Sequence, residues 1–213
     1  MPFLPKQSAE ICIKRARRFL SLADRKLTVI RVKADLRRMA LVMAVAAIDS
    51  YMHALVLRRI AAVRRSADLP KALARLEIPF SEIANLADAS IRAQREERTS
   101  RPWVQVKSSL QERLLKETFQ SYNQVATALS IAGVENGWSK ITQELGETVE
   151  ENKAWLNNLV HRRHQIVHEG DIKRASRPRR PQFNDIDQAG AEQEVDWVES
   201  LIKAIDIVVE RKP

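Results

Sequence analysis

Residues 37–56 read RRMALVMAVAAIDSYMHALV, and this segment is the strongest indication of the fold class. It contains neither glycine nor proline, which favours an uninterrupted helix. At about 100° per residue, one face of that helix carries Asp49 in the middle of five apolar side chains: Val42, Val45, Met52, Val56 and Ile60. We therefore expect one long helix over residues 35–65, with a carboxylate at the centre of its buried face.

The rest of the chain is also predicted to be helical. All five glycines lie beyond residue 132, and alternation of polar and apolar residues with a period of two is scarce, which argues against strands. Capping residues and prolines divide the chain into further helices at about 8–23, 71–76, from 81 onward, 108–119, 121–132, 148–170 and 185–210. The prediction is an all-α, antiparallel helical bundle with one long early helix, a helix at 148–170 and a C-terminal helix.

Length and composition favour one globular domain over residues 1–213, with a core at about 34–171, a basic loop at 171–184 and the last helix at 185–210. The single cysteine, Cys12, excludes an internal disulfide framework and fits a reducing compartment. The N-terminus does not read as a signal peptide, and the longest apolar run, residues 39–48, is too short to cross a bilayer. A cytoplasmic protein without a membrane partner is expected.

Positive charge is concentrated at the start of the chain. Residues 1–65 hold 15 Lys and Arg against 4 Asp and Glu, whereas the whole chain has a net charge of +9. Such an excess attracts polyanions, and phosphate contacts could supply much of an affinity for nucleic acid. Basic bias alone does not choose among RNA, DNA and an acidic protein, and solvated helix faces would look the same.

The segment LVHRRHQIVHEGD, residues 159–171, gathers groups that can handle a phosphate. On a helix, Arg163 falls in the middle of an apolar stripe formed by Leu156, Leu159, Val160, Ile166 and Val167. Burying an unpaired guanidinium costs several kcal/mol. We therefore predict that Arg163 meets Asp49 of the long helix. The alternative is that each group reaches the surface separately.

A polar stripe lies on the same predicted helix and consists of Asn157, His161, His164 and His168. It lies at roughly 100–160° from Arg163, so the arginine and His168 point in different directions on one helix. A site that uses both requires a second copy of the helix, or a distortion of the helix end at Gly170. Zinc binding by the histidines and a surface stripe without a role are the alternatives.

The string RHQIVH, residues 163–168, resembles the R-x4-H motif of the HEPN superfamily, in which a polar residue follows the arginine. The wider string RRHQIVHEGD is similar to HEPN proteins found near ribonucleases and defence systems. Residues 37–56, with Asp49, also resemble the first core helix of that superfamily. The resemblance covers about residues 34–171 and extends to the last helix.

This resemblance implies a homodimeric, metal-independent endoribonuclease that needs no cofactor, acting as a toxin or a phage-defence effector. Arg163 would stabilise the charged transition state, His168 would transfer a proton, and His164 would orient the phosphate. The supporting residues would be Asp49, Asn157, His161 and Arg162. Products would carry 2′,3′-cyclic phosphate and 5′-hydroxyl ends. RNA would be steered by the basic loop, through Arg174, Arg177, Arg179 and Arg180.

The main alternative is a non-catalytic HEPN module that binds RNA or a protein partner. An antitoxin or another regulatory protein is a further expected partner. Gly170 departs from several toxins of the superfamily, which carry a tyrosine two residues after the histidine as a target for antitoxin modification. Neutralisation by that route is therefore not expected for this chain.

Overall fold

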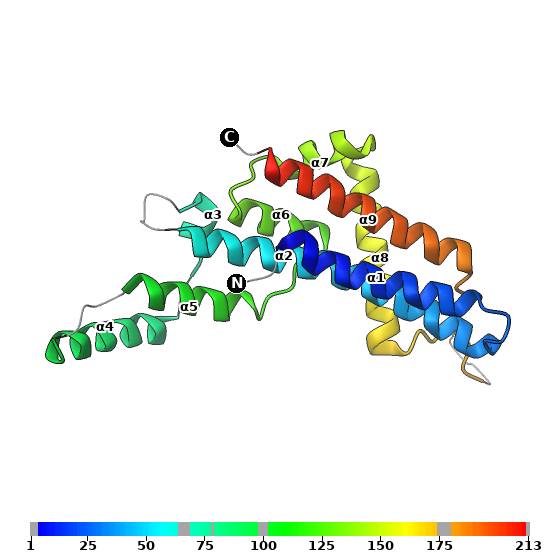
Figure 1. Cartoon of the computed structure of the whole chain (residues 1–213), viewed down its shortest axis with the longest axis horizontal. Helices are drawn as coiled ribbons and strands as arrows, with labels where there is room; N and C mark the ends of the chain where they lie inside the picture. The colour runs from blue at the N-terminus through cyan, green and yellow to red at the C-terminus, as the bar shows by residue number, and fades with distance from the viewer. Residues whose placement is uncertain (1–3, 64–68, 78, 98–101, 174–179, 212–213) are drawn as a thin grey trace.

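The computed structural model describes residues 4–63, 69–77, 79–97, 102–173 and 180–211, and these residues form helices and no strand (Figure 1). The helices are α1 (Pro5–Asp24), α2 (Ile30–Ala62), α3 (Lys71–Ala74), α4 (Phe80–Arg95), α5 (Pro102–Leu114), α6 (Tyr122–Ile131), α7 (Gly137–Leu145), α8 (Val149–Glu169) and α9 (Gln188–Glu210). The predicted all-α fold is confirmed.

The core is built around α2, which packs against α1, α5, α6, α8 and α9. Helices α1, α2 and α9 lie along one another, and α8 crosses them (Figure 1). The middle of α2 contributes many buried residues to the core, among them Val45, Ile48 and Met52, as its apolar sequence requires. A buried hydrogen bond, from the Tyr51 hydroxyl to Asp206 Oδ1 at 2.8 Å, fixes α2 against α9. Burial beside that carboxylate raises the pKa of Tyr51 well above its usual range.

Several elements differ from the sequence prediction, and α2, α5 and α7 differ most. Helix α2 begins at Ile30 instead of Asp35, because no glycine or proline stops the chain between them and Asp35 pairs with Arg38 one turn later. Helix α5 already begins at Pro102, which occupies the first helical turn. Helix α7 was not predicted, since Gly137 suggested a turn; a Cβ atom there would lie 2.8 Å from Leu129 Cδ1, so this glycine permits close packing.

Helix α8 begins and ends where its sequence predicts. The Thr148 hydroxyl accepts a hydrogen bond from Glu151 N at 3.2 Å, and Glu151 Oε2 accepts one from Thr148 N at 2.8 Å. These reciprocal bonds form a capping box. The hydrogen bonds that the Glu151 carboxylate accepts from Thr148 N and from the Thr148 hydroxyl lower the pKa of that carboxyl. At the other end, Gly170 has a φ of 64°, the left-handed conformation that ends many helices. The helix is therefore regular from Val149 to Glu169.

Helix α2 is the one described helix that is long and apolar enough to cross a membrane, judged by length and composition alone. More than half of its most apolar window, 56%, is buried inside the structure. This burial is what a core helix of a globular protein shows, and the packing of α2 against five other helices agrees with it.

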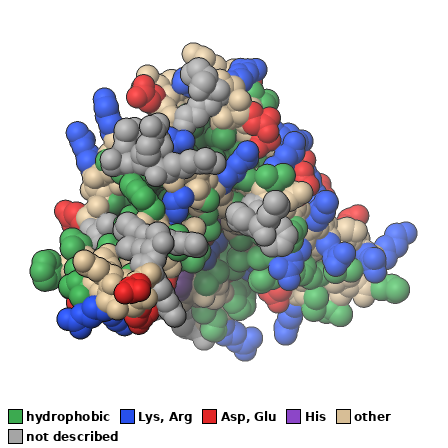
Figure 2. All heavy atoms as spheres, turned by 60° about the vertical axis from the view of Figure 1, so that its left-hand side comes forward, with side chains coloured by type: hydrophobic (Ala, Val, Ile, Leu, Met, Phe, Trp, Pro, Cys, Tyr) green, Lys and Arg blue, Asp and Glu red, His purple; other side chains and the backbone are tan. Residues whose placement is uncertain are grey.

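On the face of the molecule seen in Figure 2, Lys and Arg side chains lie beside Asp, Glu and hydrophobic side chains rather than in one continuous patch. Helices α4 and α5 pair with each other and extend away from the rest of the bundle (Figure 1). Several bulky side chains on this extension are exposed, among them Phe80, Ile91 and Val104.

We expect Leu156→Ala to lower the free energy of unfolding by about 2–5 kcal/mol, because the Leu156 side chain is fully buried where α8 enters the core. Urea unfolding followed by circular dichroism measures the effect. Leu115→Ala, which truncates an exposed leucine, is the matched control and should change stability little. Equal effects of the two substitutions would contradict the described packing of α8.

Candidate functional site

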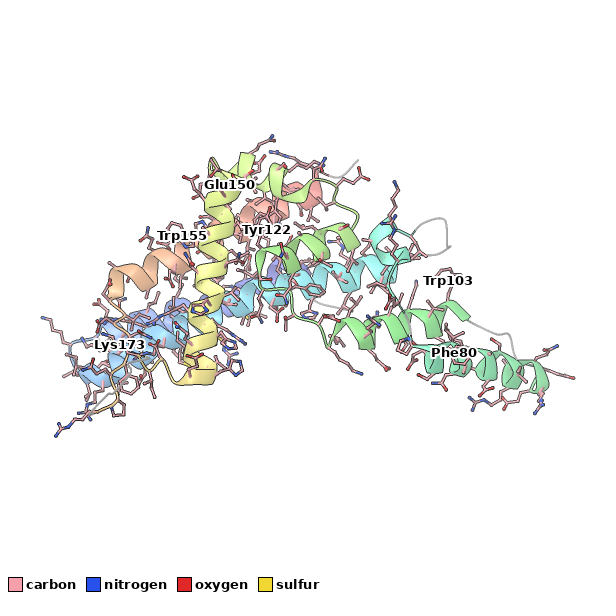
Figure 3. All side chains as sticks on the ribbon, turned by 180° about the vertical axis from the view of Figure 1, so that it is seen from behind. Phe80, Trp103, Tyr122, Glu150, Trp155 and Lys173 are labelled. Carbon is pink, nitrogen blue, oxygen red and sulfur yellow. The ribbon has the colours of Figure 1, made fainter. Side chains whose placement is uncertain are left out.

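The motif residues lie on the C-terminal half of α8, the long helix that crosses the bundle in Figure 3 and carries the labelled Glu150 and Trp155. Leu156 and Leu159 are buried, but farther along the helix Val160 and Arg163 are only half-buried and Val167 is exposed. Beyond Arg163, Ile166 still packs against the core, so one edge of the apolar stripe stays covered while the edge with Val167 is open. The prediction that this arginine is buried within the stripe is wrong, because Arg163 lies at the boundary between the covered and the open edge.

The predicted pairing of Asp49 with Arg163 is also wrong. Asp49 Oδ1 accepts a hydrogen bond from Phe119 N at 2.6 Å, and Oδ2 accepts one from Gln120 Nε2 at 3.2 Å. His53 Nε2 lies 3.7 Å from the same carboxylate. Helices α2 and α8 do pack together, yet Asp49 fixes the chain between α5 and α6. Among the described residues, Arg163 has no hydrogen bond or ion pair.

The predicted histidine stripe is exposed on α8. His164 and His168 lie side by side, with ring centroids 4.5 Å apart. His161 is exposed one turn earlier and contacts neither ring. Asn157 has a structural contact, since its Oδ1 accepts a hydrogen bond from Tyr122 N at 3.2 Å. The structure thus brings two of the three histidines together and ties Asn157 to the start of α6.

Within one chain, Arg163 and His168 do not converge. Five residues on a regular helix correspond to a rotation of about 140°, and α8 remains regular through Glu169. The left-handed conformation at Gly170 comes after both residues, so a distorted helix end does not bring them together. A site that contains both groups has to be completed from outside this helix.

Asp171 is the residue that the sequence reasoning missed as part of this region. Its side chain is 0% exposed, and two arginines from different helices bind its carboxylate. Arg162 Nη1 lies 2.6 Å from Oδ1 and its Nη2 lies 3.0 Å from Oδ2, whereas Arg38 Nε donates to Oδ2 at 2.5 Å. Such a forked, charge-assisted contact is the strongest kind of polar interaction a buried carboxylate can make. The Gly-Asp pair after the motif was the sequence signal for this residue, but it does not show which arginines bind the Asp171 carboxylate.

The same cluster closes the loop that follows α8. Asn184 N donates to the Asp171 carbonyl oxygen at 2.9 Å, and Arg38 Nη2 donates to the Asn184 carbonyl oxygen at 2.9 Å. Arg162 also donates to the Asp185 carbonyl oxygen at 3.2 Å. The C-terminal end of α8, and with it His168, is therefore held against α2 and against the chain that leads to α9.

Glu194 of α9 lies near this cluster. Burial raises the pKa of the Glu194 carboxyl, the nearby Arg162 guanidinium opposes that shift, and Asp187 adds to it. Its buried Oε2 atom has no hydrogen-bond partner among the described residues. The carboxyl thus adds a second acidic group beside the two arginines at a site where a charge is poorly solvated.

The predicted RNA-binding arginines can be placed only in part. Arg174, Arg177 and Arg179 lie outside the described residues, whereas Arg180 is described and exposed. In the described part of the chain, no three His, Cys, Asp or Glu side chains are grouped so that they could hold a metal ion. RNA binding by the basic loop therefore stays a prediction.

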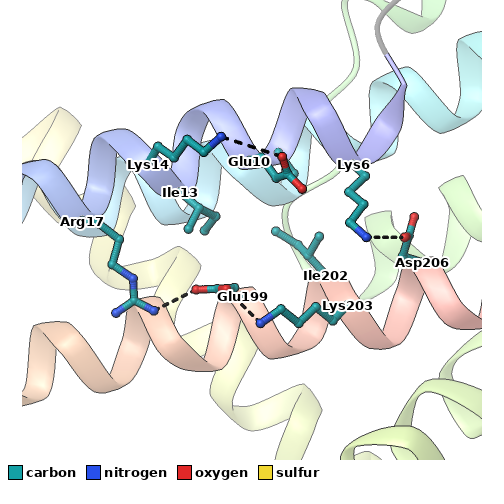
Figure 4. A pocket seen from close by; sticks show the side chains of 10 residues that line it. Lys6, Glu10, Ile13, Lys14, Arg17, Glu199, Ile202, Lys203 and Asp206 are labelled. Carbon is teal, nitrogen blue, oxygen red and sulfur yellow. Dashed lines mark hydrogen bonds and ion pairs between the residues drawn. The ribbon is translucent and has the colours of Figure 1, made fainter.

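A separate hollow of about 490 Å³ lies between α1 and α9, and none of the motif residues lines it. Its floor is apolar, with Ile13 and Ile202, and ion pairs cross it from helix to helix (Figure 4). Arg17 Nη2 lies 2.8 Å from Glu199 Oε2 at one end, and Lys6 pairs with Asp206 at the other. These charges are already neutralised across the groove, so the hollow adds no group to the motif region.

The family model described as RiboL-PSP-HEPN matches residues 11–211 of the chain. No curated protein and no solved structure has significant similarity to it. The match includes both the long helix α2 and the whole of α8, so it covers the two segments on which the resemblance was first based.

We expect Asp171→Asn to lower the free energy of unfolding by about 3–5 kcal/mol, because it leaves two buried guanidinium groups facing a neutral amide. Chemical denaturation near neutral pH measures this loss. The control, Asp185→Asn, removes a carboxylate that pairs with Lys173 at the surface, and it should have little effect. A loss no larger than that of the control would show that the carboxylate does not hold this end of α8.

Proposed function

Since this chain belongs to the RiboL-PSP-HEPN family, we propose that it is a metal-independent endoribonuclease of the HEPN type. Membership by itself indicates a module related to RNA. The observation that supports catalysis is the rigid presentation of Arg163, His164 and His168 on the uncovered part of α8. Two imidazoles 4.5 Å apart, next to an arginine without an ion pair among the described residues, are groups that can bind and cleave a phosphodiester.

The proposed reaction needs only groups that the chain supplies. One imidazole accepts the proton of the ribose 2′-hydroxyl as its oxygen attacks the adjacent phosphorus, and the bond from phosphorus to the 5′-oxygen breaks. An imidazolium donates a proton to that leaving oxygen, which balances the proton removed from the 2′-hydroxyl. The products are a 2′,3′-cyclic phosphate and a 5′-hydroxyl. Imidazole normally titrates near pH ~6.5, so it can perform both steps near neutrality.

In this proposal, His168 transfers a proton and His164 orients the phosphate or the neighbouring ring. Arg163 stabilises the additional negative charge on the phosphate oxygens, for which the forked donors of a guanidinium are well suited. Arg162 has a different task, since its guanidinium is committed to Asp171. The two adjacent arginines are thus expected to have different roles: Arg163 binds the substrate, and Arg162 holds the helix in place.

We also propose that two copies of the chain form the site. Arg163 and His168 diverge on one helix, and the uncovered face of α8 between them carries the exposed Val167 and the half-buried Val160. Apolar groups among the polar ones would let two such faces pack together. The arginine of one copy would then approach the histidine of the other, and one cleft would hold the scissile phosphate.

An endoribonuclease of this kind would act in the cytoplasm as a toxin or a phage-defence effector, under the control of an antitoxin or another regulatory protein. RNA would reach the cleft past the basic loop that contains Arg180. A first indication would be growth arrest on expression of the chain, relieved by His168→Ala.

We expect purified protein to cleave single-stranded RNA in EDTA and to leave cyclic-phosphate ends. His168→Ala should lower the rate by about 10²–10⁴-fold, as loss of a general acid or base does, and Arg163→Ala by about 10²–10³-fold, as loss of transition-state stabilisation does. Gel analysis of end-labelled RNA measures both. Arg92→Ala, an exposed arginine on α4, is the matched control.

Cleavage that survives either motif substitution would contradict the catalytic assignment. RNA binding that persists in both variants, without cleavage by the parent protein, would instead identify a non-catalytic RNA-binding module. In that case the affinity should still fall steeply with salt.

We expect the active protein to have a solution mass about twice its chain mass of 24.3 kDa. Light scattering measures the mass. Mixed dimers of Arg163→Ala and His168→Ala chains retain one intact arginine and one intact histidine on opposite copies, so they should regain cleavage that neither variant shows alone. A monomeric mass under conditions of full activity would contradict the composite cleft.

A further inference from the structure

The connection between α1 and α2 exposes four bulky aliphatic side chains in succession. Residues 25–33, called the α1–α2 tip below, read RKLTVIRVK. The exposed fraction is 98% for Leu27, 64% for Val29, 81% for Ile30 and 47% for Val32. The tip lies at the end of the bundle opposite the α4–α5 extension (Figure 1). Single exposed aliphatic residues are common, but four within six positions indicate a surface that contacts something apolar.

Four cations flank these aliphatic residues. Arg25, Lys26 and Arg31 are exposed and Lys33 is half-buried, and none of the four forms an ion pair with a described residue. Two arginines elsewhere in the same helices join separate elements: Arg17 of α1 binds Glu199, and Arg38 of α2 binds Asp171. The charges of the tip are therefore not used to hold the fold together.

We propose that the α1–α2 tip docks on an anionic lipid surface. The four cations would contact the lipid headgroups, and Leu27, Val29 and Ile30 would enter the boundary between headgroups and acyl chains. Apolar groups combined with flanking Lys and Arg are the combination that holds peripheral proteins at such a boundary. This attachment is separate from the RNA chemistry proposed for α8 and does not depend on it.

Other occupants fit the tip less well. RNA-binding surfaces commonly stack bases on aromatic rings. The tip contains no aromatic residue, and its most exposed side chains are aliphatic. A second copy of the tip would bring eight cations together against only the two exposed Asp24 carboxylates beside them, one from each copy. The aliphatic side chains also surround a narrow turn between two helices, a convex shape to which a fluid bilayer adapts more readily than a folded protein does.

The sequence alone predicted no membrane partner, because it contained no run long enough to span a bilayer. That reasoning concerned insertion across the membrane and did not show which aliphatic residues the fold leaves uncovered. Ile30 could equally have belonged to a buried face of the helix, since Ala40, Leu41 and Ala44 farther along α2 are buried. The structure instead leaves Leu27, in the connection, and Ile30, at the start of α2, exposed.

The test is sedimentation of the full chain with vesicles of phosphatidylcholine containing about one-third phosphatidylserine. We expect binding that weakens with salt and is absent on vesicles of phosphatidylcholine alone. Leu27→Ser/Ile30→Ser should lower the vesicle affinity at least about tenfold by removing inserted apolar groups. Arg25→Gln/Lys26→Gln should lower it by roughly a factor of five for each cation.

The matched control is Ile91→Ser/Val104→Ser, which removes two exposed aliphatic side chains at the opposite end of the molecule and should bind as the parent does. Circular dichroism should show all variants folded, since the substituted side chains are exposed. The proposal is overturned by a parent chain that ignores anionic vesicles, or by a tip serine variant that binds them as well as the parent. An equal loss of affinity for a single-stranded RNA in that variant would also overturn it, because the tip would then be an RNA surface.

Discussion

The buried carboxylate of Asp171 is the point on which the arrangement of the motif depends. The Asp171 carboxylate alone does not neutralise two guanidinium groups, and an excess positive charge would be unfavourable away from water. Asp35 also pairs with Arg38, and the buried carboxyl of Glu194 lies beside Arg162. Backbone carbonyls of Asn184 and Asp185 accept further hydrogen bonds from the two arginines. The cluster therefore joins α2, the end of α8 and the approach to α9 in one network.

Local sequence signals predicted the positions of the helices well, but they predicted poorly which residues of different helices contact each other. Thr148 and Gly170 act through bonds within a few residues of themselves, so the bounds of α8 could be predicted from the chain alone. The angle of Asp49 on α2 was also correct, but an angle on one helix does not fix which partner faces it. The free backbone N–H of Phe119, in a connection of no recognisable pattern, provides that partner instead of Arg163.

Arg163 also shows that a position on one helix does not determine what that residue contacts. A helix projection treats the whole apolar stripe of α8 as buried, whereas Val167 is exposed and Arg163 and Ile166 are only half-buried. Arg163 therefore reaches the surface and needs no internal counter-ion to be tolerated. The projection correctly places Arg163 among the apolar residues of α8. The structure shows that these apolar residues continue onto an exposed surface. The exposed part of this stripe carries Arg163, which has no ion pair among the described residues. Binding to another molecule explains this combination better than a role in stabilising the fold does.

The network around Asp171 also separates the two surfaces for which functions are proposed. Arg38 binds Asp171 eight residues after Ile30 on the same helix, a rise of about 12 Å along α2. This rise exceeds the Debye length of about 8–10 Å at physiological salt, so charge on a lipid surface at the α1–α2 tip would be largely screened at the Asp171 cluster. The tip and the motif of α8 are therefore expected to act independently, because neither the ion pairs of the cluster nor the motif residues lie within the tip itself.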